Sequence, residues 1–577
     1  MATRTLAQVW ARRGALPALP RVDPLIAVAA VPAAIVVGLL LLVAWVSLVD
    51  NVASPALTLR HYTTLYTDRF AYLAFLNTLG FASIALVVAL LFGLPIAWLV
   101  ERTDLPGKSL IFMFMTASLL VPGFFTAMGW LFLAHPRIGL LNQLAMGMLG
   151  LESAPFTIIS IPGMGWVQGL GLASVVFIMT AASLRAMDAS LEEAAQTSGA
   201  SFLAALRRIT LPLAFPGLLA ASLYVFTIGI SAFDIPLIIG LSNRIFVFST
   251  YLYVKSNPQE GLPDYGLAAA FATFMVLLAL LLSWLYSRVL VRARHYQVIT
   301  GKSYQPRLVR LGRWAIVAWL FISGYLLLSK LVPLAMLAWA ALLPYFQPPS
   351  PEALQQLTLR NFLNLPWPLV TRGLSNSLVL MLGAPTLALA LSLLFSWMVL
   401  RSRSRYRLAF DFVAFLPHAV PNVVFGLAAL LAALFVIRGP VDLYGSLLLL
   451  LLTYAIVQLS FGTRSTNSAL IQIHTELEEA AAVAGATPFV TWRRVVLPLL
   501  RPALLYAWLW LALLTVRELT LATVLFSPQN ITLSVVVWSL WHAGQLAQAA
   551  AVTLLMLLVF LPLAALYWRL SGGVRRV

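Results

Sequence analysis

Long runs of apolar residues, separated by short polar segments, dominate the chain. The hydropathy pattern predicts twelve such segments, at about 25–48, 78–100, 109–134, 161–183, 212–241, 265–290, 314–342, 374–400, 408–436, 443–462, 497–526 and 546–568. A helix needs about 20 apolar residues to cross the hydrocarbon core, and these segments supply them. Each must be helical, because an open strand edge cannot be satisfied in lipid, and the alternating segments typical of a transmembrane barrel are absent. The pattern therefore predicts an all-α integral membrane protein with about twelve transmembrane helices.

The composition excludes an ordinary soluble enzyme. Of the 577 residues, 61% are hydrophobic and 10% are charged, whereas soluble proteins carry about 25% charged residues. The net charge is +18 and there is no cysteine, which excludes disulfides and thiolate metal sites.

The distribution of Lys and Arg predicts the orientation of the chain. With twelve spans and an inside N-terminus, 27 of the 37 Lys and Arg residues fall on inside segments and 8 on outside segments. Such a bias is typical of cytoplasmic loops, so both termini are predicted to be cytoplasmic. No single face collects the charge, which argues against nucleic-acid binding, while the basic segment 288–313 is a candidate for contact with lipid head groups.

The sequence also repeats itself. The run Leu-Thr-Leu-Arg at 57–60 recurs at 357–360, and Pro122 in the third span is echoed by Pro421 in the ninth. Each half has six spans, an even number, so the halves share one orientation, as in parallel-repeat transporters. The predicted organisation places a pathway between the halves and divides the chain into a cytoplasmic tail at 1–24, a first six-span domain at 25–291, a cytoplasmic linker at 292–313 and a second six-span domain at 314–577.

One inside loop occurs twice with the same internal spacing. The first copy reads Glu-Ala-Ala-Gln-Thr-Ser-Gly at 193–199, and after nine residues Ile-Thr-Leu-Pro at 209–212. The second reads Glu-Ala-Ala-Ala-Val-Ala-Gly at 479–485, and after nine residues Val-Val-Leu-Pro at 495–498. A plain connector would not preserve both spacings.

Local rules predict a short surface helix in each copy. Glu and Ala favour helix, and Ser190 and Thr475 each precede a glutamate, Glu193 or Glu478, by three residues, which suits a capping box. The glycine of each loop then ends the helix, and Leu-Pro leads into the next span.

The spacing resembles the EAA loop of the permease subunits of binding-protein-dependent ABC importers, and Val495 in place of Ile is the only departure. The resemblance covers essentially the whole chain as two fused permease domains. It implies that each loop forms a coupling helix that contacts one of two copies of a cytoplasmic ABC ATPase. Carried onto this sequence, the contact residues are Glu193, Ala194, Ala195 and Gly199 for one ATPase subunit and Glu479, Ala480, Ala481 and Gly485 for the other.

The same resemblance implies the other partners and the place of the protein. A periplasmic substrate-binding protein would deliver the substrate, and the chain would span the bacterial inner membrane. The chain itself is expected to be no enzyme and to bind no cofactor, with ATP and Mg held by the partner ATPase. The Gly-Lys-Ser runs at 107–109 and 301–303 lack the leading glycine of a phosphate loop, since Arg102 and Tyr296 stand there.

Three charged residues in apolar surroundings are candidates for the translocation pathway. They are Asp234, late in the fifth span, and Arg517 and Glu518, at the roughly corresponding place in the eleventh. They either flank the pathway near its outer mouth or pair with one another, or reach the head groups, and hold the bundle together.

Other polar residues favour structural roles. Lys330 is expected to extend to an interface, and His135 and His418 to serve packing or loops rather than as ligands. Asn77 and Asn376, at the starts of corresponding spans, are expected to cap helices. No catalytic or metal site is predicted.

Within ABC importers, the stretches 184–195 and 517–520 resemble the ferric-iron group most, and thiamine, 2-aminoethylphosphonate and polyamine permeases share much of the pattern. The separate binding protein carries most of the specificity in this class, so the substrate rests on resemblance alone. A proton-coupled secondary transporter is the competing class, but the loop at 101–108 does not fit its pattern. A membrane-embedded enzyme would need clustered polar residues near one face, and the sequence has none.

Overall fold

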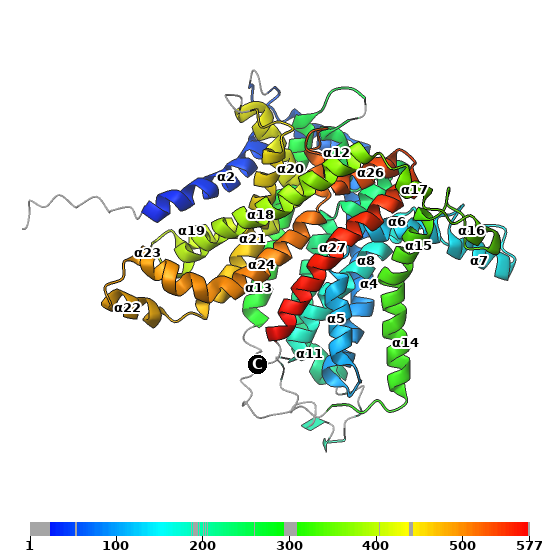
Figure 1. The fold of residues 1–577 in the computed structure, drawn as a ribbon, viewed down its shortest axis with the longest axis horizontal. Helices are drawn as coiled ribbons and strands as arrows, with labels where there is room; N and C mark the ends of the chain where they lie inside the picture. The colour runs from blue at the N-terminus through cyan, green and yellow to red at the C-terminus, as the bar shows by residue number, and fades with distance from the viewer. Residues whose placement is uncertain are drawn as a thin grey trace, which may run out of the picture.

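A computed structural model describes residues 24–51, 55–185, 187, 194–195, 197–199, 201, 204, 206–258, 260–293, 308–402, 404–437 and 442–574. Within these residues the chain is almost entirely helical, and pairing between extended segments is limited to two isolated bridges. The helices pack side by side into one bundle (Figure 1). The prediction of an all-α membrane protein is confirmed.

Ten helical stretches are long and apolar enough to cross a membrane. They are α2 (Pro24–Val46), α4 (Arg69–Arg102), α8 (Ile161–Arg185), α11 (Leu211–Ser231), α13 (Tyr265–Ala293), α14 (Trp314–Leu326) continued by the π-helical turn Leu327–Leu331 and α15 (Val332–Ala341), α18 (Trp367–Leu400), α21 (Leu447–Ile471), α24 (Leu497–Val516) and α27 (Leu546–Val574). Two further π-helical turns, Leu206–Thr210 and Trp492–Val496, precede α11 and α24.

The third and ninth spans are broken rather than straight. The third consists of α5 (Lys108–Ser118) and α6 (Gly123–Ala134) at 94° to one another. The ninth consists of α19 (Arg407–Ala419) and α20 (Asn422–Leu431) with the turn Ala432–Val436, at 105°. Each second helix starts after Pro122 or Pro421, which has no backbone N–H to continue a helix. Counting these two bent pairs as spans gives the twelve predicted ones; a third bent pair, Pro236–Asn243 with Phe248–Ser256 at 67°, follows α11.

The fifth and eleventh spans end earlier than the hydropathy pattern predicted. Helix α11 ends at Ser231 rather than 241, and α24 at Val516 rather than 526. In each half, shorter helices follow: Pro236–Gly240, Leu241–Asn243 and α12 (Phe248–Ser256) in the first, and α25 (Thr520–Val524) and α26 (Leu533–His542) in the second. The pattern missed these breaks because apolar residues continue past them. Since α11 and α13 already account for two crossings, the intervening helices re-enter and return on one side.

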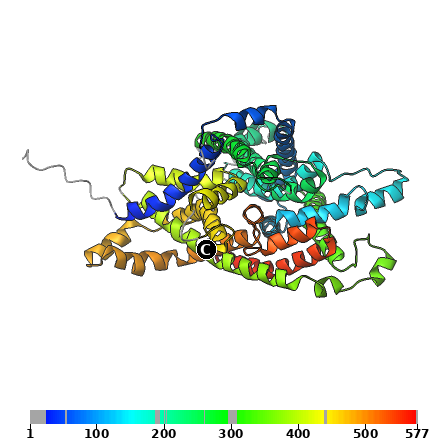
Figure 2. The same ribbon diagram turned by 90° about the horizontal axis from the view of Figure 1, so that it is seen from above.

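The first span of each half packs against the other half. Helix α2 lies against α18, α19 and α20, and α15 lies against α6 while α14 lies against α4. The chain seen from above shows α2, in blue, crossing beside the yellow and light green helices of the second half (Figure 2). The two halves are therefore interlocked, a feature that the linear domain boundaries did not anticipate.

Small residues bring α4 and α8 into close contact. A Cβ on Gly169 would lie 2.5 Å from Cβ of Val88, and one on Gly93 would lie 2.5 Å from the carbonyl oxygen of Ala173. Glycine at these positions lets the backbones approach, as is common between membrane helices. The remaining short helices are α3 (Arg60–Thr67), α7 (Leu140–Leu149), α16 (Pro351–Gln355), α17 (Arg360–Leu363), α22 (Thr475–Val483) and α23 (Pro488–Thr491).

Candidate functional site: a central cavity and two surface loops

A cavity of about 600 Å³ lies between the two halves. Its wall is built from both broken spans near their bends, from α8 and the end of α11 in the first half, and from α21 and the end of α24 in the second. In Figure 1 the ends of α21 and α24 nearest α22 diverge from α5 and α11. The broken spans thus create a chamber at the interface whose wall is mostly apolar, with polar groups at the bends, where a straight helix would have covered them.

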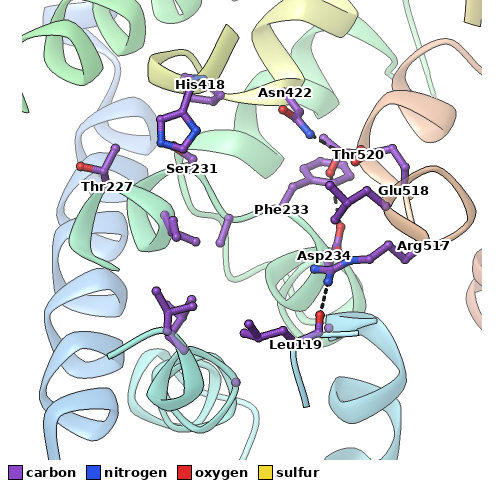
Figure 3. A pocket seen from close by; sticks show the side chains of 18 of the residues that line it. Leu119, Thr227, Ser231, Phe233, Asp234, His418, Asn422, Arg517, Glu518 and Thr520 are labelled. Carbon is purple, nitrogen blue, oxygen red and sulfur yellow. Dashed lines mark hydrogen bonds between the residues drawn. The ribbon is translucent and has the colours of Figure 1, made fainter. Parts of the chain in front are cut away.

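The three predicted pathway residues meet in this cavity (Figure 3). Arg517 donates from Nη1 to the carbonyl oxygen of Leu119, at the bend of the third span. Thr520 donates from Oγ1 to Oδ1 of Asp234, 3.3 Å away. Both contacts join the second half to the first. The residues therefore line the cavity and also connect the two halves; that they flank a translocation pathway stays a prediction.

Asp234 and Glu518 occupy equivalent positions in their halves. Asp234 lies beside Gly123, the first residue of α6, where a Cβ would lie 3.8 Å from Asp234 Oδ2. Glu518 accepts hydrogen bonds from Asn422, the first residue of α20, at 3.2 Å, and from the backbone N–H of Leu521 at 3.1 Å. A helix N-terminus favours negative charge, so each carboxylate is stabilised by the half-helix of its own domain.

Lys330 is buried in the cavity wall rather than at an interface. It lies in the π-helical turn of the seventh span, 8% of its surface is exposed, and its side chain lines the cavity. The expectation that it extends to an interface is wrong, because the turn directs it between the halves.

The two histidines make packing and loop contacts, and His418 also lines the cavity (Figure 3). His418 stacks on the ring of Tyr224, with centroids 5.4 Å apart, and Nδ1 of His135 accepts from the backbone N–H of Arg137 in a loop. Among the described residues no group of three or more His, Cys, Asp or Glu side chains is arranged to hold a metal ion.

Asn77 and Asn376 do not cap helices, as had been expected. Both lie inside helices of 34 residues, α4 and α18. Asn77 Nδ2 donates to the carbonyl of Phe246 at 2.9 Å, and Asn376 Nδ2 donates to those of Gln529 at 3.0 Å and Ile531 at 2.9 Å. The second and eighth helices begin earlier than their apolar runs, which is why these positions looked like helix starts. Each Asn instead fixes the re-entrant segment before α12 or α26.

The neighbouring residue strengthens each of these clamps. The hydroxyl of Thr78 accepts from the backbone N–H of Phe248 at 2.7 Å, and that of Ser377 accepts from the N–H of Leu533 at 2.9 Å. The same pair of contacts therefore anchors α12 and α26 at their first turns, where helix N–H groups have no partner within the helix.

We expect Asn376→Ala to lower the free energy of unfolding by about 1–3 kcal/mol, because two backbone carbonyls lose their donor. Thermal unfolding of the purified protein in detergent, followed by tryptophan fluorescence, measures this. The control is Gln347→Ala, which removes an exposed hydrogen bond to Gln356 and should change stability by at most about 0.5 kcal/mol. Equal effects of the two substitutions would show that the clamp does not hold the re-entrant segment.

The second surface loop is a helix with an exposed outer face. Glu479 and Ala480 are exposed and Ala481 is half-buried in α22, with Val483 90% exposed beside them. Gly485 has φ +85°; its N–H donates to Ala482 O, and the next N–H to Ala481 O. These bonds form a Schellman C-cap, so the predicted glycine stop is confirmed.

The first surface loop is described only in part. Ala194 and Ala195 are helical and Gly199 has φ +86°, matching its counterpart. Glu193 and its expected cap Ser190 lie outside the described residues.

The capping box predicted for the second copy is wrong. His474, not Thr475, is the N-cap of α22, and no side chain caps it. Glu478 instead forms an ion pair with Arg401, at the end of α18, with Nε and Oε1 2.8 Å apart. Arg401 also donates to the carbonyls of Leu470 and Ile473. The glutamate is drawn away from the helix start because a nearby arginine offers a charged partner.

The first half has a related ion pair. Arg185, the last residue of α8, donates from Nε to Oε2 of Glu101 at 3.1 Å, and Glu101 lies near the end of α4. In both halves an ion pair therefore joins the end of the second span, α4 or α18, to the part of the chain at the surface loop. That part is the end of α8 in the first half and helix α22 in the second.

Comparison with known proteins identifies the family to which this chain belongs. The family described as binding-protein-dependent transport system inner membrane component matches the chain twice, at residues 89–295 and 387–576. The chain belongs to this family. It is an ABC transporter permease with two copies of the family's domain in one polypeptide. Within the permease, each matched region contains one surface loop and one re-entrant segment.

Two similar proteins are described as ferric permeases. A putative ferric transport system permease protein of Haemophilus influenzae is 23% identical over 455 residues, which cover 77% of this chain and 68% of the relative. An Fe(3+)-transport system permease protein from the same organism is 24% identical over 529 residues, 91% of this chain and 94% of the relative.

Another relative is described by a different substrate. A putative 2-aminoethylphosphonate transport system permease protein of Salmonella typhimurium is 31% identical over 149 residues, 26% of this chain and 55% of that protein.

Sequence reasoning found the charged residues of the cavity but not their partners. Leu119 acts through its backbone carbonyl, which no residue pattern can reveal. Asn422 and Thr520 could have been found, since one follows the repeated Pro421 and the other follows the Arg-Glu pair by two residues.

Proposed function

We propose that this permease is the membrane-spanning subunit of an ATP-driven importer that takes up ferric iron. The observation that carries the proposal is the duplicated surface loop, with its exposed helix in the second copy and its glycine cap in both, in a family that depends on a binding protein. The full-length ferric relatives support iron as the substrate. The protein would lie in the bacterial inner membrane with both termini in the cytoplasm, as the distribution of Lys and Arg favours.

In this mechanism the substrate moves by alternating access. A loaded periplasmic binding protein docks on the outer segments 49–77, 242–264 and 343–373. Two ATPase subunits, which hold ATP and Mg, contact the surface loops through Glu193, Ala194, Ala195 and Gly199 and through Glu479, Ala480, Ala481 and Gly485. Closure of the ATPase dimer brings the loops together and opens the cavity outward, and hydrolysis restores the inward-facing state.

The helix that follows each loop supports this coupling. The second loop leads through the turn Trp492–Val496 into α24, whose far end is followed at once by Arg517 and Glu518. With 20 residues, α24 spans about 30 Å. The first loop leads in the same way through α11 toward Asp234. A movement of either loop would therefore reach the contacts between the halves along a single helix.

We expect Arg401→Gln to reduce the rate of ATP-driven uptake severalfold, because α22 loses the ion pair and hydrogen bonds that fasten it beside α18. Uptake into proteoliposomes with the partner ATPase measures this. The matched control is Arg405→Gln, an exposed arginine that contacts only its neighbour Tyr406 by hydrogen bond in the described chain. If both variants transport at the wild-type rate, the fastening of α22 plays no part in coupling.

The substrate is tested by uptake into cells that lack their own importers and express the permease with its ATPase and binding protein. We expect accumulation of ferric iron and not of thiamine, 2-aminoethylphosphonate or a polyamine. If one of the last three accumulates and iron does not, the protein is still an importer, but ferric iron is not its substrate. A proton-coupled secondary transporter remains the competing mechanism, and it predicts uptake without the ATPase.

A further inference from the structure

The cavity wall contains a buried lysine that no described carboxylate contacts directly. Lys330 is more than nine-tenths buried, and in the described part of the chain none of the ion pairs involves it. Burying an unpaired ammonium group costs several kcal/mol, and an ionisable residue at membrane depth marks a functional site by default. Lys330 therefore faces the cavity without a direct ion-pair partner among the described residues.

The two carboxylates of the cavity already have donors of their own. Asp234 accepts from Thr520, and Glu518 accepts from Asn422 and from the backbone of Leu521. Each also lies at the start of a half-helix, where the backbone dipole stabilises it. They balance the formal charge of the cavity as a whole, but they leave the ammonium group of Lys330 without a direct contact.

Two more donors line the same cavity as Lys330. Ser118 is 5% exposed and lines the cavity; its hydroxyl lies beside that of Tyr325 but makes no well-aligned hydrogen bond among the described residues. Ser118 precedes Leu119, whose carbonyl accepts from Nη1 of Arg517, and Lys330 lines the same cavity as Arg517, where their like charges repel one another. Among the described residues, Nε and Nη2 of Arg517 make no hydrogen bond. The cavity thus presents an ammonium group, a guanidinium group and a hydroxyl group that can all donate.

We propose that Lys330, Ser118 and Arg517 form an oxyanion site, and that the transported ligand presents carboxylate, phosphonate or phosphate oxygens to it. The site rests on the proposed function, since it assigns a substrate chemistry to the same cavity. Ferric iron would then cross together with an accompanying oxyanion, because the described residues offer no cluster of metal ligands that could take the bare ion. A free organophosphonate would present the same chemistry.

The test is equilibrium binding to the full chain in lipid nanodiscs, without ATPase or binding protein, by isothermal titration calorimetry. The probes are ferric citrate, citrate, 2-aminoethylphosphonate, inorganic phosphate and, as a cation, putrescine. We expect at least one oxyanion probe to bind, and Lys330→Met to weaken it about tenfold or more, as for loss of a charged hydrogen bond. Lys330→Arg should retain binding, and the exposed control Arg310→Gln should leave it unchanged.

The outcomes separate the sources of the oxyanion. Binding of ferric citrate but not of 2-aminoethylphosphonate supports a ferric complex, and the reverse supports a free organophosphonate. Failure of every oxyanion to bind, binding of putrescine alone, or equal binding to wild type and Lys330→Met would overturn the site. If Lys330→Met does not fold, Ser118→Ala replaces it and should weaken binding about threefold; unchanged affinity would then overturn the site. ATP-driven uptake is measured separately, so failure of the oxyanion site and failure of the importer assignment are distinguishable.

Discussion

Replacing Gly485 with arginine is expected to abolish ATP-driven uptake while leaving the permease folded in the membrane. A Cβ at this position would meet no atom within 4 Å, so the fold has room for a side chain. The left-handed backbone, with φ +85°, adds strain of about 1–2 kcal/mol. Neither effect unfolds a large membrane protein. The long cationic side chain would instead stand on the exposed face of the loop, where we place the ATPase. Uptake into proteoliposomes, at matched protein levels, measures the loss.

Two further substitutions at Gly485 separate strain from contact. Gly485→Asn tolerates the left-handed conformation and should transport at close to the wild-type rate. Gly485→Ala carries the strain without the bulk and should lose stability but keep uptake. Gly199→Arg, the corresponding substitution in the first loop, should also block uptake. Wild-type uptake by both arginine variants would remove the coupling assignment.

Replacing Arg517 with methionine is expected to have the second-largest effect, on stability and on uptake. Arg517 joins the halves through the carbonyl of Leu119 and lines the same cavity as Asp234. Losing a hydrogen bond made by a charged group costs about 1.5–3 kcal/mol, and the loss also leaves the charge of Asp234 without its nearby opposite charge. We therefore expect a lower thermal unfolding midpoint and a loss of transport, since the contact between the halves is broken.

A second substitution and an exposed pair provide the controls. Asp234→Asn on the Arg517→Met background should recover part of the lost stability, because it removes the uncompensated carboxylate. Arg60→Met breaks an exposed ion pair with Asp50 whose atoms are 3.9 Å apart, and pairs of this kind contribute about 0–1 kcal/mol. If Arg517→Met costs no more than Arg60→Met, then Arg517 does not link the halves.

The spans and the surface loops could be predicted from the sequence because their signals are local. An apolar run of sufficient length marks a span wherever it packs, and a helix ended by glycine at fixed spacing marks each loop. The bend of the third span could have been predicted, since Pro122 interrupts the apolar run and Pro421 stands at the corresponding place in the ninth span. The contact that the bend makes could not have been predicted, because the carbonyl of Leu119 accepts a hydrogen bond from Arg517, nearly 400 positions away.

The tertiary features could not be predicted because they depend on which elements meet. Asn376 looked like a helix cap at the start of an apolar run, and only the return of the chain before α26 shows why an amide is needed there. Glu478 matched a capping box until Arg401 approached from another helix. Lys330 was expected to extend to the membrane interface. Because α15 packs against α6, the turn before α15 lies in the cavity wall, and Lys330 with it.

The central claim, that the permease is driven by a partner ATPase through its two surface loops, is tested most directly in proteoliposomes. They contain the permease and ATPase, enclose ATP and Mg, and face a ferric-loaded binding protein outside. We predict that iron enters only when ATP is enclosed, that a proton ionophore does not stop it, and that Gly485→Arg abolishes it. Iron uptake that proceeds without ATP and collapses with the ionophore would contradict the claim.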